Sequence, residues 1–186
     1  VTTNLPTPTV VQGDDYFNTV LYTGDGSNSN SISTVGFQPD WVWVKGRTGG
    51  NNSLYDAVRG AGKVLFSNTT EQEYTTNDLT SFDSSGFTVS TVGGTRTETN
   101  ANGQTYVAWN WKANGAGVSN TAGTISSTVS VSTTSGFSIV TYSGQNAAGT
   151  VGHGLGVAPK MYIVKRRNDT GGWPVYHASL GQYLVY

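Results

Sequence analysis

Alternation of apolar and polar residues is the dominant pattern in this chain. In segment 41–45 (Trp-Val-Trp-Val-Lys), the tryptophans and the lysine fall on one face of an extended strand and the valines on the other. Segment 105–111 (Thr-Tyr-Val-Ala-Trp-Asn-Trp) alternates in the same way. Similar runs, separated by Gly, Asn, Asp and Ser, predict strands near residues 17–23, 31–37, 41–46, 63–67, 86–92, 104–111, 124–132, 137–143, 160–166 and 173–177.

Helical patterns are nearly missing. Few segments space apolar residues by three and four, and 25 glycines interrupt most windows long enough for a helix. The one helix predicted is short, over Leu54–Gly62, with Gly60 and Gly62 as its stop. The predicted fold class is therefore all-β: an antiparallel β-sandwich or jelly-roll-like unit, followed by a partial second copy.

The second copy is predicted from an internal repeat. A shift of 120 positions superimposes residues 17–47 on 137–167 without a gap, and one inserted residue extends the match to Tyr55/Tyr176 and Gly60/Gly181. The identities far exceed the roughly two that chance would give at these residue frequencies. Equal spacing predicts the same local fold for both segments. The identical pairs over 17–47 are Phe17/Phe137, Val20/Val140, Tyr22/Tyr142, Gly24/Gly144, Gly36/Gly156, Pro39/Pro159, Val44/Val164, Lys45/Lys165 and Arg47/Arg167.

The repeat divides the chain into four predicted parts. Residues 1–13, with Pro6 and Pro8, form an N-terminal arm or linker; 14–112 form the first repeat domain, 113–134 a connector and 135–186 a partial second repeat.

The partial repeat has no counterpart of residues 67–112, so its strands would present unpaired edges. A longer native chain, a strand from a neighbouring subunit, or packing on the first copy would each complete it. A longer chain is favoured, because the sequence does not begin with Met.

Charge and cysteine content exclude several classes of function. Charged residues make up 11% of the chain, against roughly 25% in ordinary soluble domains, and the net charge is -1. No basic surface is available to hold nucleic acid, and no apolar run approaches the roughly 20 residues that span a bilayer. Without cysteine there is no thiol catalysis and no cysteine zinc site.

Candidate catalytic and metal-binding residues are few. Segment 24–30 (Gly-Asp-Gly-Ser-Asn-Ser-Asn) resembles a calcium loop but has no terminal glutamate, so a hairpin turn is favoured. His153 and His177 have no partner at metal-ligand spacing, and the 11 carboxylates are scattered without a pair suited to glycoside hydrolysis. We therefore expect no catalytic residue, no metal and no cofactor.

The aromatic residues are the candidate binding groups. Five tryptophans and 10 tyrosines could stack against sugars, although packing in the core is the more common role of such side chains. The tryptophan face of segment 41–45 would be covered by the rest of the chain or would meet a partner. The weak binding candidates are Trp41, Trp43, Lys45, Arg47 and Trp173.

Several strings resemble a repeat domain of bacteriophage structural and tail-fibre proteins, common in marine and cyanobacterial phages. They cover almost everything from residue 14 onward: Tyr16–Gly24, Val35–Lys45, Asp56–Gly60, Ser67–Thr70, Leu79–Asp83, Ser85–Phe87, Tyr106–Lys112, Gly152–Lys160 and Val175–Gly181. In such proteins the repeat usually runs to completion, so the truncated second copy is a departure.

The resemblance implies a non-enzymatic, extracellular virion protein: a tail fibre, spike or capsid-decorating module. Its expected partners are copies of itself, other virion proteins and a host surface glycan, with no nucleic acid and no membrane insertion. It carries over no catalytic or binding residue. The alternatives are a carbohydrate-binding module, which would show an exposed aromatic row, and a polysaccharide-degrading tailspike, which would need paired carboxylates.

Overall fold

The computed structural model describes residues 12–92, 99–180 and 184–185. Within these ranges the regular structure consists of β-strands and two short 3-10 turns, Gly13–Asp15 and Ala178–Leu180. All strand pairs are antiparallel, so the prediction of an all-β, antiparallel chain is confirmed. No helix in this part of the chain has the length and apolarity to cross a membrane. Most of the predicted N-terminal arm, residues 1–11, lies outside the described residues.

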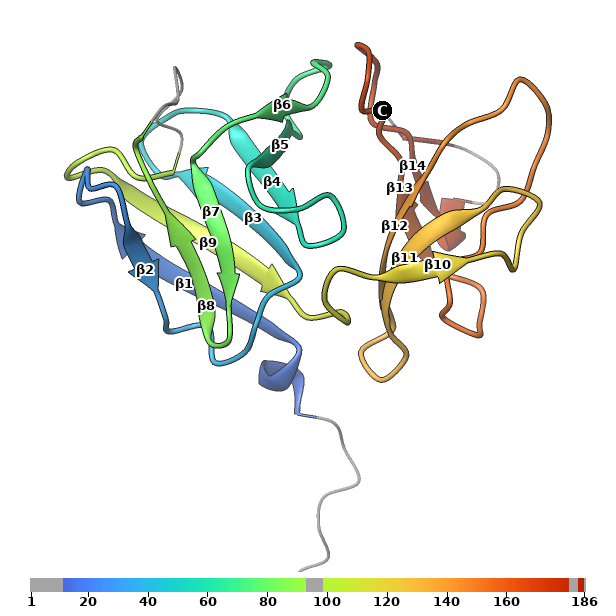
Figure 1. Ribbon diagram of the computed structural model, residues 1–186, viewed down its shortest axis with the longest axis horizontal. Helices are drawn as coiled ribbons and strands as arrows, with labels where there is room; N and C mark the ends of the chain where they lie inside the picture. The colour runs from blue at the N-terminus through green and yellow to red at the C-terminus, as the bar shows by residue number, and fades with distance from the viewer. Residues whose placement is uncertain (1–11, 93–98, 181–183, 186) are drawn as a thin grey trace, which may run out of the picture.

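The strands lie in two groups, β1 to β9 and β10 to β15, which Figure 1 shows side by side. Their bounds are β1 Phe17–Thr23, β2 Asn30–Ile32, β3 Trp41–Gly46, β4 Asn52–Asp56, β5 Lys63–Phe66, β6 Tyr74–Thr75, β7 Leu79–Asp83, β8 Gly86–Val89, β9 Thr105–Trp111, β10 Val118–Asn120, β11 Ser127–Ser132, β12 Phe137–Tyr142, β13 Met161–Ile163, β14 Val175–His177 and β15 Leu184–Val185.

A six-stranded sheet in the order β1-β9-β3-β4-β5-β6 is the largest element of the first group. Strand β9 lies between β1 and β3, and its Trp111 is opposite both Phe17 and Trp41. Strand β9 is the last of these in sequence, so the sheet closes only when a distant segment inserts between two early strands. A second sheet has the order β2-β8-β7.

The buried core of the first group takes its side chains from both of these sheets. Val42 and Val44 are 0% and 1% exposed, so the valine face of β3 points into the core, while Phe87 and Val89 of β8 meet it from the three-stranded sheet. Burial of a large apolar side chain contributes roughly 1.5–3 kcal/mol, which makes this cluster the main source of stability in the first group. Its buried members are Val20, Ile32, Val35, Phe37, Val42, Val44, Tyr55, Val64, Phe66, Leu79, Phe87, Val89, Tyr106 and Ala108.

The helix predicted over Leu54–Gly62 is wrong. Its first residues belong to β4, which pairs with β3 from Lys45↔Asn52 to Trp41↔Asp56, and a turn follows. Gly60 and Gly62 have positive φ angles of 91° and 78°, which end the strand region rather than a helix. Strand β4 pairs with β3, whose alternating tryptophans and valines strongly favour a strand. This pairing overrides the local preference of Leu54–Gly62 for a helix.

The second group contains two three-stranded sheets, β10-β11-β12 and β13-β14-β15. The range 113–134, predicted as a connector, holds β10 and β11. A parallel bridge between Ile125 and Val151 and a hydrogen bond from Ser127 Oγ to Gly152 O (3.3 Å) attach the segment after β12 to this region.

Several contacts of the first group recur in the second at the repeat spacing. Residues 161 and 177, which pair between β13 and β14, are 120 and 121 positions after residues 41 and 56, which pair between β3 and β4. The adjoining backbone bonds recur as well, Ala57 N–H to Asp40 O at 2.8 Å and Ala178 N–H to Lys160 O at 2.7 Å. Lys45, near the end of β3, and Lys165, just after β13, also have glycine partners at equivalent positions: Lys45 Nζ donates to Gly50 O and Lys165 Nζ to Gly171 O, each at 2.7 Å.

Candidate functional site

An aromatic cluster covers part of the outer face of the six-stranded sheet. Period-two alternation places Trp41 and Trp43 of β3 beside Trp111 and Trp109 of β9. Ring centroids are 4.6 Å apart for Trp41 and Trp111 and 5.6 Å apart for Trp43 and Trp109, within the range of favourable aromatic pairs. Phe17 of β1 extends the cluster, with its ring 4.8 Å from that of Trp111.

Phe137 of β12 covers one end of this cluster. Its ring stacks 5.7 Å from Trp41 and 6.2 Å from Trp111, with interplanar angles of 21° and 24°. The tryptophans are consequently half-buried, whereas Phe17 and Leu21 on the same sheet face are 39% and 66% exposed. The cluster therefore joins the two groups of strands and leaves an open apolar margin along β1.

The remaining binding candidates do not join this cluster. Lys45 Nζ donates to Gly49 O at 3.1 Å and to Gly50 O, so it holds the loop after β3. Arg47 lies beyond the end of β3 and is exposed. Trp173 Nε1 donates to Phe66 O at 3.2 Å and Thr69 O at 2.9 Å, which fixes the loop before β14 on the loop after β5.

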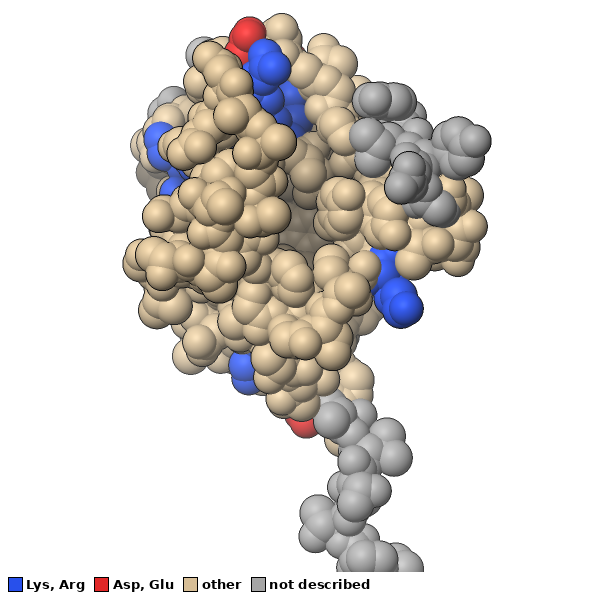
Figure 2. Space-filling view, turned by 90° about the vertical axis from the view of Figure 1, so that its right-hand side faces the viewer, with Lys and Arg blue, Asp and Glu red and all other residues tan. Residues whose placement is uncertain are grey.

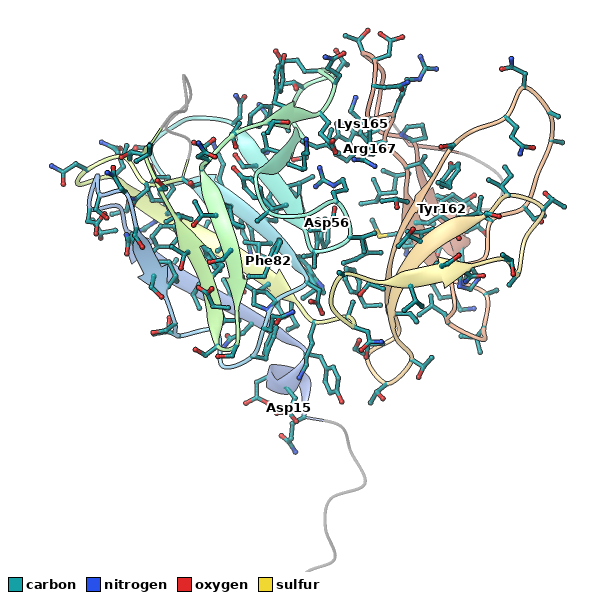
Figure 3. All side chains as sticks on the ribbon, viewed as in Figure 1. Asp15, Asp56, Phe82, Tyr162, Lys165 and Arg167 are labelled. Atoms are coloured by element: carbon teal, nitrogen blue, oxygen red, sulfur yellow. The ribbon has the colours of Figure 1, made fainter. Side chains whose placement is uncertain are left out.

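Four charged side chains form a second cluster between the two groups; three of them are largely buried, and the fourth, Arg167, is 43% exposed. Arg59 forms a close ion pair with Asp56, donates to Glu73 Oε2 at 3.2 Å and to Leu54 O at 3.0 Å. Glu73 also accepts from Arg167 Nε at 2.8 Å and Nη2 at 3.0 Å. The exposed fractions of the Arg59, Asp56 and Glu73 side chains are 4%, 8% and 12%. Figure 3 shows Arg167 and Lys165 reaching toward the first group above Asp56.

Sequence reasoning missed this charged cluster. Arg167 was identified only through the repeat, and no local pattern joins it to Glu73, which is 94 positions away. The one usable signal was the scarcity of charge. In a chain with 11% charged residues, an arginine is expected to pair with a specific carboxylate.

We expect Glu73 to make the stability of the chain acid-sensitive. Burial raises the pKa of Glu73, but hydrogen bonds from Arg167 and the charges of Arg59 and Arg167 outweigh burial and lower the pKa from its ordinary 4.5. A lowered folded-state pKa adds stability above about pH 4.5, and this stability is lost as the pH falls through the folded-state value. In urea unfolding, the free energy of unfolding should fall less from pH 7 to pH 3 for Glu73→Gln than for wild type. Asp14→Asn, at an exposed position, should behave like wild type; equal losses for all three chains would contradict the prediction.

The side chain of Asn100 organises the loop 24–30. Asn100 is fully buried, and its Nδ2 donates to Asp25 Oδ1 and to Ser27 O, both at 3.0 Å. Backbone and side-chain hydrogen bonds from Ser27 and a bond from Asn100 lower the pKa of Asp25. In the described part of the chain no three His, Cys, Asp or Glu side chains gather to hold a metal ion.

The two histidines make local contacts. His153 Nδ1 accepts the backbone N–H of Leu155, and His177 Nδ1 accepts that of Ser179, both at 3.2 Å. Each bond spans two residues and stabilises a turn.

A shallow polar hollow of about 320 Å³ lies on the second group. Its lining consists of hydroxyl side chains of β10, β11 and β12, the ring of Tyr142 and the side chain of Arg167. Tyr142 is 44% exposed, so one aromatic ring is accessible beside a row of hydroxyl groups.

A family model matches residues 12–186, and so spans both groups of strands. The chain belongs to the family described as Domain of unknown function (DUF7483). No curated protein and no solved structure matches the chain. Membership of DUF7483 therefore assigns no activity, and the candidate sites rest on the residues described above.

Proposed function

We propose that the chain is a non-enzymatic structural module of a bacteriophage particle: a tail fibre, spike or capsid-decorating element. The observation that carries the proposal is the resemblance to phage structural repeats. Its three longest strings within residues 14–112 are 16–24, 35–45 and 106–112. They contain β1 and all but one residue of β3 and of β9, and these three strands are neighbours in one sheet. The resemblance thus lies in a continuous piece of scaffold rather than in scattered residues.

The proposal includes the finer architecture, a β-sandwich of jelly-roll type over 14–112 and a partial copy of it over 135–186. The core shared by the two sheets of the first group supports the sandwich. The recurring pairs Trp41↔Asp56 and Met161↔His177 support the repeat. Gly36 and Gly156, 120 positions apart, also share a positive φ, of 90° and 74°.

The surface chemistry suits an extracellular particle. With a net charge of -1 and 11% charged residues, solubility rests on Ser, Thr, Asn and backbone groups. The side of the second group drawn in Figure 2 carries only a few scattered charges. Such a surface can pack against copies of itself or other virion proteins without a strong electrostatic penalty, and it offers no basic area for nucleic acid.

The proposal is tested by the composition of purified particles. Mass spectrometry of gradient-purified virions of the encoding phage should detect the chain in many copies, and gold-labelled antibodies should mark a fixed position on the particle. A replication protein of the same phage serves as the negative control. Presence in the lysate but absence from the particles would refute the virion role. Release of reducing ends from host polysaccharide by the purified chain would refute its non-enzymatic character and favour the tailspike alternative.

Carbohydrate binding is the second candidate, and the polar hollow on β10 to β12 favours it. An accessible tyrosine ring beside hydroxyl groups offers both stacking and hydrogen bonds to a sugar. A glycan array should then give signals that Tyr142→Ala abolishes. Tyr16→Ala is the matched control, because Tyr16 lies in the first group of strands, just before β1. Signals that persist in Tyr142→Ala would place binding elsewhere.

A further inference from the structure

The polar hollow on the second group has a wall of hydroxyl groups. Ser119 of β10 is opposite Thr128 of β11, and Thr128 is opposite Thr141 of β12. Residues directly opposite each other share a face of the sheet, so these three side chains form a row across the three strands. All three line the hollow. Because each hydroxyl group can both donate and accept, the row suits a ligand that itself carries many hydroxyl groups, such as a sugar.

Arg167 adds a cation to the lining of this hollow. Its Nε and Nη2 donate to the two carboxylate oxygens of Glu73 at 2.8 and 3.0 Å, which fixes the plane of the guanidinium group. The third nitrogen, Nη1, forms no hydrogen bond with a described residue, and the side chain is 43% exposed. The N–H groups of a preoriented cation therefore remain available to a ligand.

The charged cluster alternates in sign and ends at the hollow. Asp56 pairs with Arg59, which also bonds Glu73. Glu73 in turn pairs with Arg167, the one exposed member of the four. An anion bonded to Nη1 of Arg167 would continue this alternation. Its charge-assisted hydrogen bonds would be roughly twice as strong as those of a neutral hydroxyl group.

We propose that the hollow binds an acidic sugar, whose anionic group bonds Nη1 of Arg167 and whose hydroxyl groups bond the row formed by Ser119, Thr128 and Thr141. A carboxylate and a sulfate ester both supply the anionic oxygens that a guanidinium group recognises. The inference rests on the carbohydrate-binding candidate above, of which it names the ligand class, and it is independent of the virion role.

An array of bacterial surface glycans tests the proposal with the full chain. Each acidic glycan on the array is matched with a neutral glycan of the same linkage, for example a glucuronate with a glucose. We expect the acidic member of a bound pair to give a signal at least about tenfold stronger than the neutral member. Carboxylated and sulfated glycans are scored separately, so the array also identifies which anionic group is recognised.

Two substitutions separate a ligand contact from a structural role of the ion pair. Arg167→Met should lower the signal from acidic glycans at least about tenfold, because it removes the cation and keeps the aliphatic stem. Glu73→Gln should keep the signal or strengthen it. Glutamine still accepts a hydrogen bond from Arg167, and the competing negative charge is gone. If the pair served only to hold the two groups of strands together, both variants would lose the signal equally.

Arg47→Met is the matched control, because Arg47 stands at the repeat-equivalent position in the first group and is exposed. It should bind acidic glycans like wild type. Unchanged hydrogen exchange in β10 to β12 shows that a variant is folded. Thr141→Val provides a second variant that leaves the ion pairs intact, and loss of its hydroxyl group should weaken binding about threefold.

Several results would overturn the acidic-sugar inference but leave carbohydrate binding in place. They are equal signals from matched neutral and acidic glycans, an unchanged signal in folded Arg167→Met, and equal losses in Arg167→Met and Glu73→Gln. The absence of a signal from every glycan would overturn both the inference and the carbohydrate-binding candidate. None of these results affects the virion role, which depends on particle composition.

Discussion

Replacing Arg59 by alanine should lower the free energy of unfolding by about 3–5 kcal/mol. The guanidinium group is 4% exposed and bonded to Asp56, to Glu73 and to the backbone oxygen of Leu54. Removing it leaves the largely buried Asp56 carboxylate without its cation and Glu73 with Arg167 alone. The desolvation cost of Asp56 is then uncompensated, and that of Glu73 is compensated only in part.

Arg166→Ala is the matched control for this substitution. Arg166 also pairs with an aspartate three positions away, Asp169 at 3.1 Å, but their side chains are 61% and 63% exposed. Exposed pairs contribute roughly 0–1 kcal/mol, so Arg166→Ala should hardly change the free energy of unfolding measured in urea at pH 7. Equal effects of the two substitutions would show that the Arg59 cluster is solvated and adds little.

A double-mutant cycle separates the cluster from simple loss of packing. Arg59→Ala and Glu73→Gln remove partners of the same interaction, so their combined effect should fall short of the sum of the single effects. Additive effects would mean that Arg59 stabilises the chain through its aliphatic stem alone. Since Glu73 also bonds Arg167 of the second group, a second cycle with Glu73→Gln and Arg167→Ala measures the coupling between the two groups of strands.

The strands best predicted from sequence were those with period-two alternation. Strands β1, β3 and β12 begin where predicted, and β9 lies within its predicted range, because alternating aromatic and β-branched residues suit a half-buried sheet. Strands β4 and β7 were missed. Asn52–Asp56 and Leu79–Asp83 contain the polar and turn-forming residues that favour loops, and only pairing with β3 and β8 makes them strands.

The candidate site was predictable in its parts but not in its assembly. Alternation correctly put Trp41 and Trp43 on one face and the valines on the other. That the valine face is the buried one depends on the second sheet, and that Phe137 covers the tryptophans depends on contacts across almost 100 residues. A one-dimensional pattern specifies which residues share a face, but not what that face meets.

Replacing Phe87 by alanine should cost about 3–5 kcal/mol of unfolding free energy. The side chain is fully buried in the core between the six-stranded and the three-stranded sheet, with its ring 6.1 Å from that of Tyr22. Truncation removes the transfer free energy of the ring and leaves a cavity that close-packed neighbours fill only in part. Phe17→Ala is the matched control, because Phe17 is 39% exposed on the outer face and should cost markedly less. If Phe87→Ala unfolds in urea at the same midpoint as Phe17→Ala, the two sheets do not share a tightly packed core. If the difference is large and both transitions remain single, the packed core between the sheets sets the stability of the first group, and the sandwich part of the proposal gains direct support.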